Sequence, residues 1–264
     1  MYKKEEVILQ VENVNLSYDR PILRNVNFNI HNITRVGIQQ GQIVSLIGRS
    51  GIGKTQLFKI LSGLLIPQTG SVKIENDLHP VIAGEVGVVP QNYILFNHRS
   101  ILDNLKLGLR GSPNKYSEKE KAELIKEYAN KFELAEHLKK YPMQLSGGQR
   151  QRVSIIQQIL TGNRFILLDE PFSGLDPVIK DKVVELLVSI SLLNELNTLI
   201  IISHDIENSL AISDTAFILA NQEGHLGSTI TETIDLMQMG LAWNPEIKKI
   251  KAFQDLVAQI KFRI

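Results

Sequence analysis

The sequence of 264 residues contains no cysteine, which excludes disulfide bridges and thiolate metal sites. It also has no uninterrupted apolar run near the ~18 residues of a membrane-spanning helix, so any membrane span is expected in another chain. A signal peptide is not expected, because the charged stretch from Lys3 to Glu6 is not followed by a long apolar segment. The net charge is only +1, which offers nucleic acid no strong field, so no nucleic-acid partner is expected.

Hydrophobic residues make up 43% of the chain and charged residues 22%, which is typical of a globular protein with a substantial core. Alternation of apolar and polar residues over 7–28 predicts antiparallel strands. The apolar run 43–47 enters a glycine-rich loop, and helical spacing follows over 55–65. A strand, a glycine loop and a helix in this order open an α/β fold. Further strands are expected at 71–74, 85–89, 165–168, 198–202 and 216–220, and a mainly helical region at 100–160.

The glycine loop matches the phosphate-binding pattern G-x-x-x-x-G-K-[ST], known as Walker A. Its glycines let backbone N–H groups converge on one point, to which the following helix adds its positive end. Lys54 is expected to reach the β- and γ-phosphates of a nucleotide, and the Thr55 hydroxyl to bind Mg²⁺. The matching residues are Gly48, Arg49, Ser50, Gly51, Ile52, Gly53, Lys54 and Thr55.

A second functional site, which is acidic, is expected where the apolar run 165–168 ends in Asp169 and Glu170. Acids at the carboxyl end of a parallel strand lie where such sheets bind ligands. Asp169 fits the Walker B role of holding Mg²⁺. Glu170 is placed to act as a general base on the attacking water.

The segment Leu145-Ser146-Gly147-Gly148-Gln149 lies between these two motifs, and with them it resembles the signature of the ABC (ATP-binding cassette) ATPases. The resemblance covers about 9–227. It implies a P-loop NTPase (RecA-like) α/β core with an N-terminal antiparallel β-subdomain and an inserted α-helical subdomain. It also implies that Ser146, Gly147, Gly148 and Gln149 bind the ATP held by the Walker A loop of a partner subunit, in a head-to-tail pair.

The remaining family positions follow from the same resemblance. Tyr18 is similar to the aromatic residue that stacks on adenine, and Gln91 to the glutamine that contacts Mg²⁺ and senses the γ-phosphate. The segment 173–176 resembles the loop that crosses to the partner. His204 resembles the switch histidine that contacts the γ-phosphate and positions water, so Glu170, His204, Lys54 and Gln91 are the expected catalytic group, with ATP and Mg²⁺ as cofactors.

The expected organisation is a cassette at 7–228, with the helical subdomain at about 92–160, and a helical tail at 229–264. Compared with the family spacing, 32–40 lengthens the stretch before the strand at 43–47 and leaves the register of the β-subdomain open. The family's Ala-Arg-Ala-Leu segment is replaced here by Gln157-Gln158-Ile159-Leu160. That change is expected to affect helix packing more than catalysis.

The resemblance implies an ATP-hydrolysing transporter subunit that acts as a homodimer or with a paired cassette. Its place would be cytoplasmic, peripheral on the inner face of the membrane, bound there only through a transmembrane permease subunit. The surface expected to meet the permease is 92–104, including Tyr93, Leu95 and Phe96; internal packing is the alternative for these residues. Two groups are similar, the nitrate/sulfonate/taurine importers and the phospholipid-trafficking cassettes. A soluble ABC ATPase, for example in iron–sulfur cluster assembly, is the alternative function, whereas Glu170 and His204 argue against a module without turnover.

Overall fold

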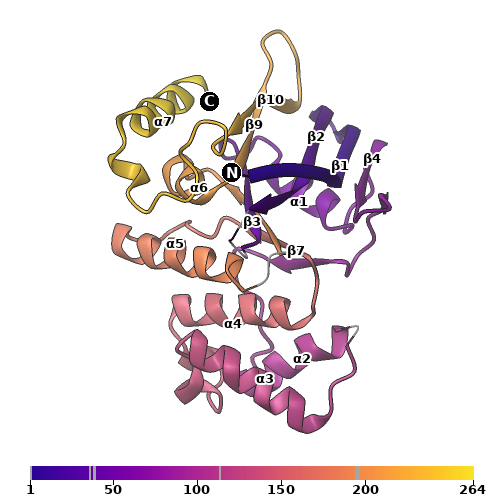
Figure 1. Cartoon of the computed structure of the whole chain (residues 1–264). Helices are drawn as coiled ribbons and strands as arrows, with labels where there is room; N and C mark the ends of the chain where they lie inside the picture. Colours follow the sequence, from indigo (N-terminus) through magenta and orange to yellow (C-terminus); the bar gives the residue numbers. More distant parts are fainter. Residues whose placement is uncertain (1, 36, 38–39, 113, 194–196) are drawn as a thin grey trace.

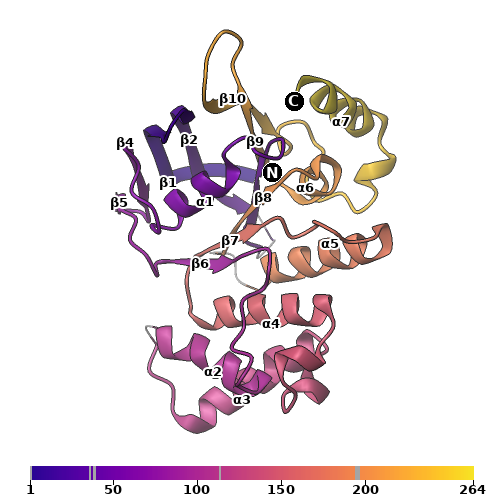
Figure 2. The ribbon, with the colours of Figure 1, turned by 180° about the vertical axis from the view of Figure 1, so that it is seen from behind.

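A computed structural model describes residues 2–35, 37, 40–112, 114–193 and 197–264. Within these ranges the strands form one sheet in the order β5-β4-β1-β2-β10-β9-β3-β8-β7-β6. Helices cover both faces of its parallel half, and a group of helices projects beyond its β6–β7 edge (Figures 1 and 2). This arrangement is the predicted α/β core with an added helical subdomain.

The antiparallel half of the sheet comes mainly from the N-terminal part of the chain. β1 (Tyr2–Ser17) pairs with β2 (Pro21–Arg35) on one side and with β4 (Thr69–Ile74) on the other, and β5 (His79–Pro80) extends β4. Alternation of buried and exposed residues along β2 produces this half-buried sheet. The predicted antiparallel strands are therefore confirmed. The lengthened segment 32–40 continues β2 to Arg35, and its residues 36, 38 and 39 lie outside the described residues.

The parallel half consists of β3 (Gln42–Ile47), β8 (Thr198–Ser203), β7 (Phe165–Asp169) and β6 (Val86–Val89), with β9 (Thr215–Asn221) beside β3. All six residues of β3 and of β8 are buried, as expected for strands covered on both faces. Because these strands are parallel, their carboxyl ends meet at one edge of the sheet.

Helices α1 (Lys54–Leu61), α5 (Pro177–Ser191) and α6 (Ile206–Ile212) pack on the sheet. The helical subdomain contains α2 (Ile101–Gly111), α3 (Glu118–Lys131) and α4 (Gly147–Leu160), with short 3₁₀ turns at Ala135–His137 and Pro142–Gln144. α2 and α4 cross at Gly108, where a Cβ atom would lie 2.3 Å from the carbonyl oxygen of Gln157. The close crossing therefore requires glycine at this position.

The prediction of a helical tail from residue 229 is wrong for its first part. β10 (Ser228–Asp235) is a strand that pairs antiparallel with β9. Five of the six residues at 229–234 are β-branched and favour the extended conformation, and β9 supplies the backbone partners. The helical part is limited to a 3₁₀ turn at Ile247–Lys249 and α7 (Lys251–Arg263).

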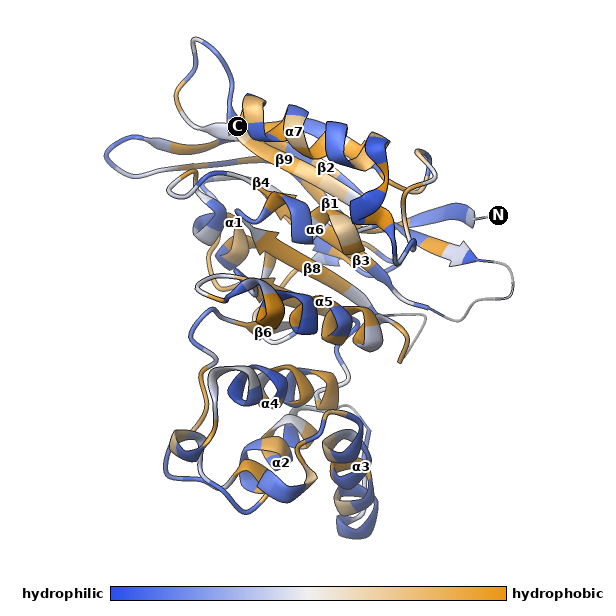
Figure 3. Ribbon diagram, turned by 90° about the vertical axis from the view of Figure 1, so that its left-hand side faces the viewer, coloured by the Kyte–Doolittle hydropathy of each residue, from blue (hydrophilic) through white to orange (hydrophobic). Residues whose placement is uncertain are grey.

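α7 lies over β9 with its apolar side toward the sheet (Figure 3). Phe253, Val257 and Ile260 are buried there against Ala216 and Ile218. The tail is thus packed onto the cassette core. No helix in the described part of the chain has the length and apolar character needed to cross a bilayer.

Candidate active site

The loop 48–53 joins the carboxyl end of β3 to the first residue of α1, as the sequence predicts. A Cβ atom at Gly48 would lie 2.6 Å from the carbonyl oxygen of Leu219 in β9. Gly53 has φ +108°, a backbone conformation that favours glycine. These two glycines allow the loop to pass closely over the sheet before α1 begins at Lys54. Arg49, Ser50 and Gly51, and Thr55 in the first turn of α1, are exposed, whereas Lys54 is buried.

Lys54 links the loop to the second acidic site. Its Nζ donates to the carbonyl oxygens of Gly48 (2.9 Å) and Arg49 (3.0 Å) and lies 3.2 Å from Glu170 Oε1. The Lys54 side chain is only 7% exposed, so this ion pair is poorly screened by solvent. Lys54 and Glu170, which are 116 positions apart in the sequence, therefore bring the two motifs into direct contact.

Glu170 follows β7 and is held in place by the end of β8. Its φ of 50° is in the left-handed region, which is costly for a residue with a Cβ. Its N–H donates to the carbonyl oxygen of Ile202 at 2.7 Å. Its Oε2 accepts hydrogen bonds from Ser203 Oγ (3.2 Å) and His204 N–H (3.2 Å), and lies 2.7 Å from His204 Nδ1. Since the carboxylate can only accept, His204 carries its hydrogen on Nδ1 in this arrangement.

The residues expected to hold Mg²⁺ present hydroxyl, carboxylate and amide oxygens, which are the hard ligands that this ion prefers. Burial and then the charge of Glu170 raise the pKa of Asp169, although Lys54 opposes them. A cation beside Asp169 would offset this crowding of negative charge. Within the described residues no group of three or more His, Cys, Asp or Glu side chains is arranged to hold a metal. A donor set of Thr55, Asp169 and Gln91 fits Mg²⁺, which binds few protein ligands and completes its shell with water and phosphate oxygens.

Two further predicted residues lie beside this site. Tyr18, in the turn between β1 and β2, is 61% exposed, and its hydroxyl lies 3.3 Å from Gln56 Oε1 in α1. Gln91 follows β6, and its Nε2 donates to Ser173 Oγ at 3.2 Å, directly after the acidic site. The structure therefore brings Gln91 near the loop that follows Glu170, and Tyr18 next to the helix that follows the phosphate loop.

The signature turn forms the amino end of α4. Ser146 caps this helix: its Oγ accepts from Gln149 N–H at 3.3 Å, while Gln149 Oε1 accepts from Ser146 N–H at 2.9 Å. Gln149 Nε2 also lies 2.9 Å from His137 Nε2, so His137, given no role from the sequence, contacts the signature. The Gln149 side chain is thus engaged within its own subunit.

The structure does not bring the signature to the phosphate loop of the same chain. α1 packs on the sheet, whereas α4 lies among the projecting helices (Figures 1 and 2). Ser146, Gly147 and Gly148 instead line a cavity of about 780 Å³ between α4 and α5.

Sequence reasoning missed two serines at the site. Ser203, the last residue of β8, donates to Glu170 Oε2, and its position next to His204 was the available signal. Ser228, which is 1% exposed, has its Oγ within hydrogen-bond distance of two carbonyl oxygens, those of Ile52 (2.7 Å) and Ile22 (3.0 Å), and so links β10 to the phosphate loop. No local motif marks Ser228, because its partners belong to distant segments.

The expected permease-facing loop 92–104 is partly internal. Leu95 is only 9% exposed and packs in the core of the helical subdomain, as the alternative of internal packing expects, and its remaining surface lines a small cavity beside Met143 and Arg150. Burial raises the pKa of Tyr93 to about 12, in line with partial packing of its ring. Asn104 is fully buried and fixes the loop through bonds to the backbone of Phe96. Ile94 and Phe96 remain exposed, at 72% and 50%.

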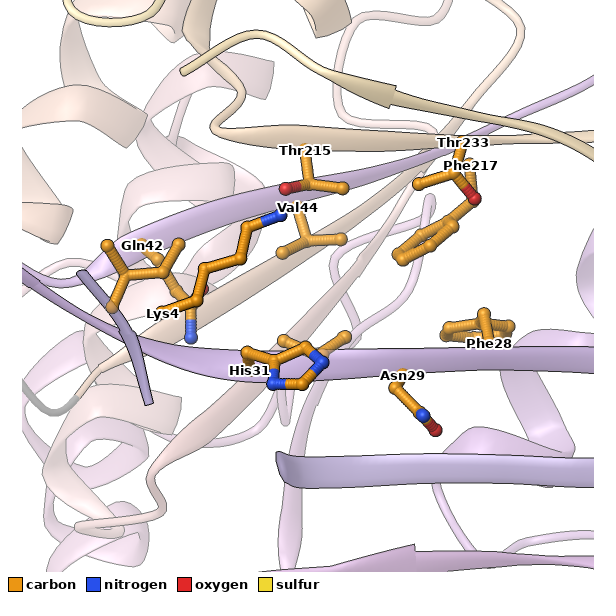
Figure 4. Close-up of a pocket in the computed structure, with 11 residues that line it drawn as sticks. Lys4, Phe28, Asn29, His31, Gln42, Val44, Thr215, Phe217 and Thr233 are labelled. Carbon is orange, nitrogen blue, oxygen red and sulfur yellow. The ribbon is translucent and has the colours of Figure 1, made fainter. Parts of the chain in front are cut away.

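A separate cavity of about 260 Å³ lies between the beginning of β1, the later part of β2 and the beginnings of β3 and β9 (Figure 4). It forms because β2 and β10 pair only at Leu23 and Ser228, so the two halves of the sheet diverge. Phe28, Val44 and Phe217 form its apolar walls, and Lys4 and His31 face it from β1 and β2. It includes none of the predicted site residues and lies at the amino ends of the parallel strands, opposite the edge used by the phosphate loop.

The sequence matches the family model described as ABC transporter over residues 31–173. It is 35% identical over 209 residues to the sulfate/thiosulfate import ATP-binding protein CysA of Pseudomonas syringae pv. tomato, covering 75% of this chain and 63% of that protein. It is 34% identical over 220 residues to the spermidine/putrescine import ATP-binding protein PotA of Spiroplasma citri, covering 81% and 59%. The chain thus spans less than two thirds of the length of these relatives.

The fold is also that of a solved structure, cbiO1 from Clostridium perfringens, described as part of the ABC transporter complex cbiONQ. The TM-score is 0.72 at 24% identity, covering 98% of this chain and 96% of that one. At this identity the likeness shows the fold, and it confirms the predicted P-loop architecture. With a family match over more than half of its residues, the chain belongs to the ABC transporter family.

Proposed function

We propose that this chain is the ATP-binding and ATP-hydrolysing subunit of an ABC transporter. The observation that carries the proposal is that Glu170 contacts both Lys54 and His204 next to a glycine-rich phosphate loop. This group combines a cation for phosphate oxygens, a carboxylate for a water molecule and an imidazole beside it. The relatives named above are import ATP-binding proteins, which favours transport over a soluble ATPase of another pathway.

Each residue has a distinct role in the proposed reaction. Lys54 and the N–H groups of the loop bind the β- and γ-phosphates and offset the charge that develops during phosphoryl transfer. Glu170 orients and deprotonates the attacking water, with its carboxylate fixed by Ser203 and His204. Tyr18 stacks on the adenine. Mg²⁺, held by Thr55, Asp169 and Gln91, would neutralise charge on the phosphates.

The active unit is proposed to be a head-to-tail pair, because the signature turn and the phosphate loop lie on separate parts of one chain. A second subunit supplies its Ser146, Gly147, Gly148 and Gln149 turn to the nucleotide held by the first. ATP then favours the closed pair, since its phosphates bind donors of both subunits. A paired cassette of different sequence could take the place of the second copy.

Mixing two inactive variants tests the composite site. Ser146→Arg and Lys54→Ala are each expected to lower ATP turnover at least about tenfold, since each removes a contact to the phosphates. A mixed pair holds one site in which both parts are intact. An equal mixture is therefore expected to recover up to about a quarter of wild-type turnover, measured as phosphate release. If the mixture of the two variants does not recover turnover, the head-to-tail site is refuted. If wild-type protein itself does not hydrolyse ATP, the proposed function fails.

We also propose that a permease helix binds near the loop after β6. There, Asn92, Tyr93 and Ile94 line a cavity of about 420 Å³ together with Met143 and Arg150. Ile94 and Met143 are 72% and 80% exposed, which is unusual for apolar residues that flank one cavity. Location at the inner membrane face would follow from this contact alone.

Ile94→Glu is expected to reduce solute uptake at least about fivefold while leaving ATP hydrolysis by the isolated chain within about twofold, because a charge in this cavity opposes an apolar helix. Uptake and hydrolysis are measured on the same variant, in cells that carry the chain's permease. Ile66→Glu is the matched control, since Ile66 is 86% exposed and lies outside the cavity. Normal uptake with Ile94→Glu would contradict the docking surface.

A further inference from the structure

The C-terminal segment places one lysine between two helices that begin near the active site. Lys248 lies in the 3₁₀ turn Ile247–Lys249, where Ile247 is 3% exposed in the core formed with α7 and β9. The turn is fixed further by Gln254 Nε2, which donates to the carbonyl oxygen of Lys248 at 3.0 Å. The backbone that presents this lysine is therefore held by the tail packing.

The ammonium group of Lys248 bridges α5 and α6. Its Nζ is 2.9 Å from Asp181 Oδ1 in α5 and 2.8 Å from Asn208 Oδ1 in α6. The Asp181 side chain is 64% exposed, so its ion pair alone contributes little to stability. The contact to Asn208 is the one that connects Lys248 to residues near the active site.

Asn208 in turn binds Asp205, the residue that follows His204. Its Nδ2 donates to both Asp205 carboxylate oxygens at 3.1 Å, and its backbone N–H donates to Asp205 Oδ1 at 3.1 Å. An ammonium group can only donate and a carboxylate can only accept, so the amide oxygen of Asn208 must face Lys248 and its amide nitrogen Asp205. Lys248 thereby fixes the orientation of this side chain.

Asp205 joins this chain of contacts to the catalytic group. Lys180 Nζ lies 2.7 Å from Asp205 Oδ2. The backbone N–H of Asp205 donates to Ser203 Oγ at 3.0 Å. Burial would raise the pKa of Asp205, but the hydrogen bonds from Lys180 and Asn208 keep it below its ordinary value. The ionised carboxylate holds the backbone on one side of His204, while Ser203 and His204 contact Glu170 on the other.

We infer that Lys248 is a positioning residue for His204, acting through Asn208 and Asp205, so that the C-terminal segment controls the geometry of hydrolysis. The inference rests on the proposed ATP hydrolysis. A residue that acts on geometry alone should alter kcat, because a misplaced His204 reduces reaction in the bound complex. The KM for ATP should stay constant, since Lys248 lies beyond the residues expected to bind the nucleotide.

Lys248→Met keeps the aliphatic stem and removes the donors, and it is expected to lower kcat roughly fivefold to tenfold with KM within about twofold. Lys248→Arg, which restores a cationic donor, should recover most of the loss. Lys249→Met is the matched control, because that neighbouring side chain is 78% exposed and pairs only with Glu246 within the described residues. Thermal unfolding midpoints should agree among the three variants.

Amide hydrogen exchange over 204–212 gives a second measurement that does not depend on turnover. Lys248→Met should exchange faster there than wild type and Lys249→Met, while α7 is unchanged. Wild-type kcat and unaltered exchange in Lys248→Met would overturn the inference. A loss of kcat in Lys249→Met equal to that in Lys248→Met would also overturn it. So would a loss of kcat in Lys248→Met that is accompanied by a lower unfolding midpoint of that variant. Absence of turnover in wild-type protein would instead count against the proposed function.

Discussion

Glu170→Gln is expected to reduce ATP turnover about 10²- to 10³-fold, the size expected when a general base is removed. The amide keeps the volume of the carboxylate but cannot take a proton. Glu170 Oε1 faces Lys54 and Oε2 faces His204, so a glutamine satisfies only one of these two donors with its single oxygen. Nucleotide binding should persist because the phosphate loop is unaltered. With hydrolysis blocked, the closed pair should accumulate.

Phosphate release, nucleotide binding and size-exclusion chromatography with Mg²⁺ and ATP separate these effects. Glu207→Gln is the matched control: Glu207 lies in α6, its side chain is 48% exposed, and its partner Lys261 is 3.8 Å away. That variant should keep wild-type turnover and should not accumulate as a dimer. Full activity of Glu170→Gln would refute the assignment of the base. Loss of nucleotide binding would show instead that the contact to Lys54 shapes the phosphate loop.

The central part of this site could be predicted because its residues lie at the ends of elements that the sequence marks clearly. The apolar runs at 43–47, 165–168 and 198–202 are three adjacent parallel strands. Once their carboxyl ends are placed at one edge, Lys54, Glu170 and His204 must be near one another. Two of the phosphate-loop glycines have equally local reasons, since a Cβ at Gly48 would meet the backbone of β9 and Gly53 has a positive φ.

What the sequence could not supply depends on long-range contacts. β10 needs β9 as a partner, which periodicity over 229–235 does not reveal. Leu95 is in a loop that could face either way, and the buried Asn104 turns it inward. The contacts of Lys248 reach α5 and α6 across 67 and 40 positions of the chain, and nothing in the local pattern at 247–249 distinguishes it from Lys249. Contacts of this kind are defined only by the packed tertiary structure.

A buried ion pair joins the end of β2 to the start of β9. Arg35 Nη2 lies 2.8 Å from Asp214 Oδ1, and the two side chains are 3% and 1% exposed. Asp214 Oδ2 also accepts from Ile43 N–H at 2.8 Å, and the guanidinium lies 3.8 Å from the centre of the Trp243 ring. Burial raises the pKa of Asp214 to about 6, even though Arg35 and the hydrogen bonds favour the ionised form. The pair thus fixes the β-subdomain, the core sheet and the C-terminal segment at one point.

Arg35→Met is expected to lower the free energy of unfolding by about 3–5 kcal/mol at pH 8, because it leaves the Asp214 carboxylate buried without its counter-ion. The deficit should shrink toward pH 5. A carboxyl with a pKa raised in the fold stabilises the protein when protonated, and this contribution is lost as the pH rises through the folded pKa. Removing Arg35 raises that pKa further, so the free energy of unfolding of the variant approaches that of wild type as the pH falls. Urea unfolding at both pH values measures the change.

Arg263→Met provides the control, since Arg263 pairs with Glu232 at the surface and its side chain is 57% exposed. Its removal should cost less than about 1 kcal/mol at either pH. A loss in Arg35→Met that stays constant with pH would mean that packing of the arginine stem, and not the isolated charge, determines its effect. A double variant, Arg35→Met with Asp214→Asn, should then be no more stable than Arg35→Met. If the charge is responsible, the double variant should recover part of the loss at pH 8 and little at pH 5, where the remaining carboxyl of the single variant is already neutral.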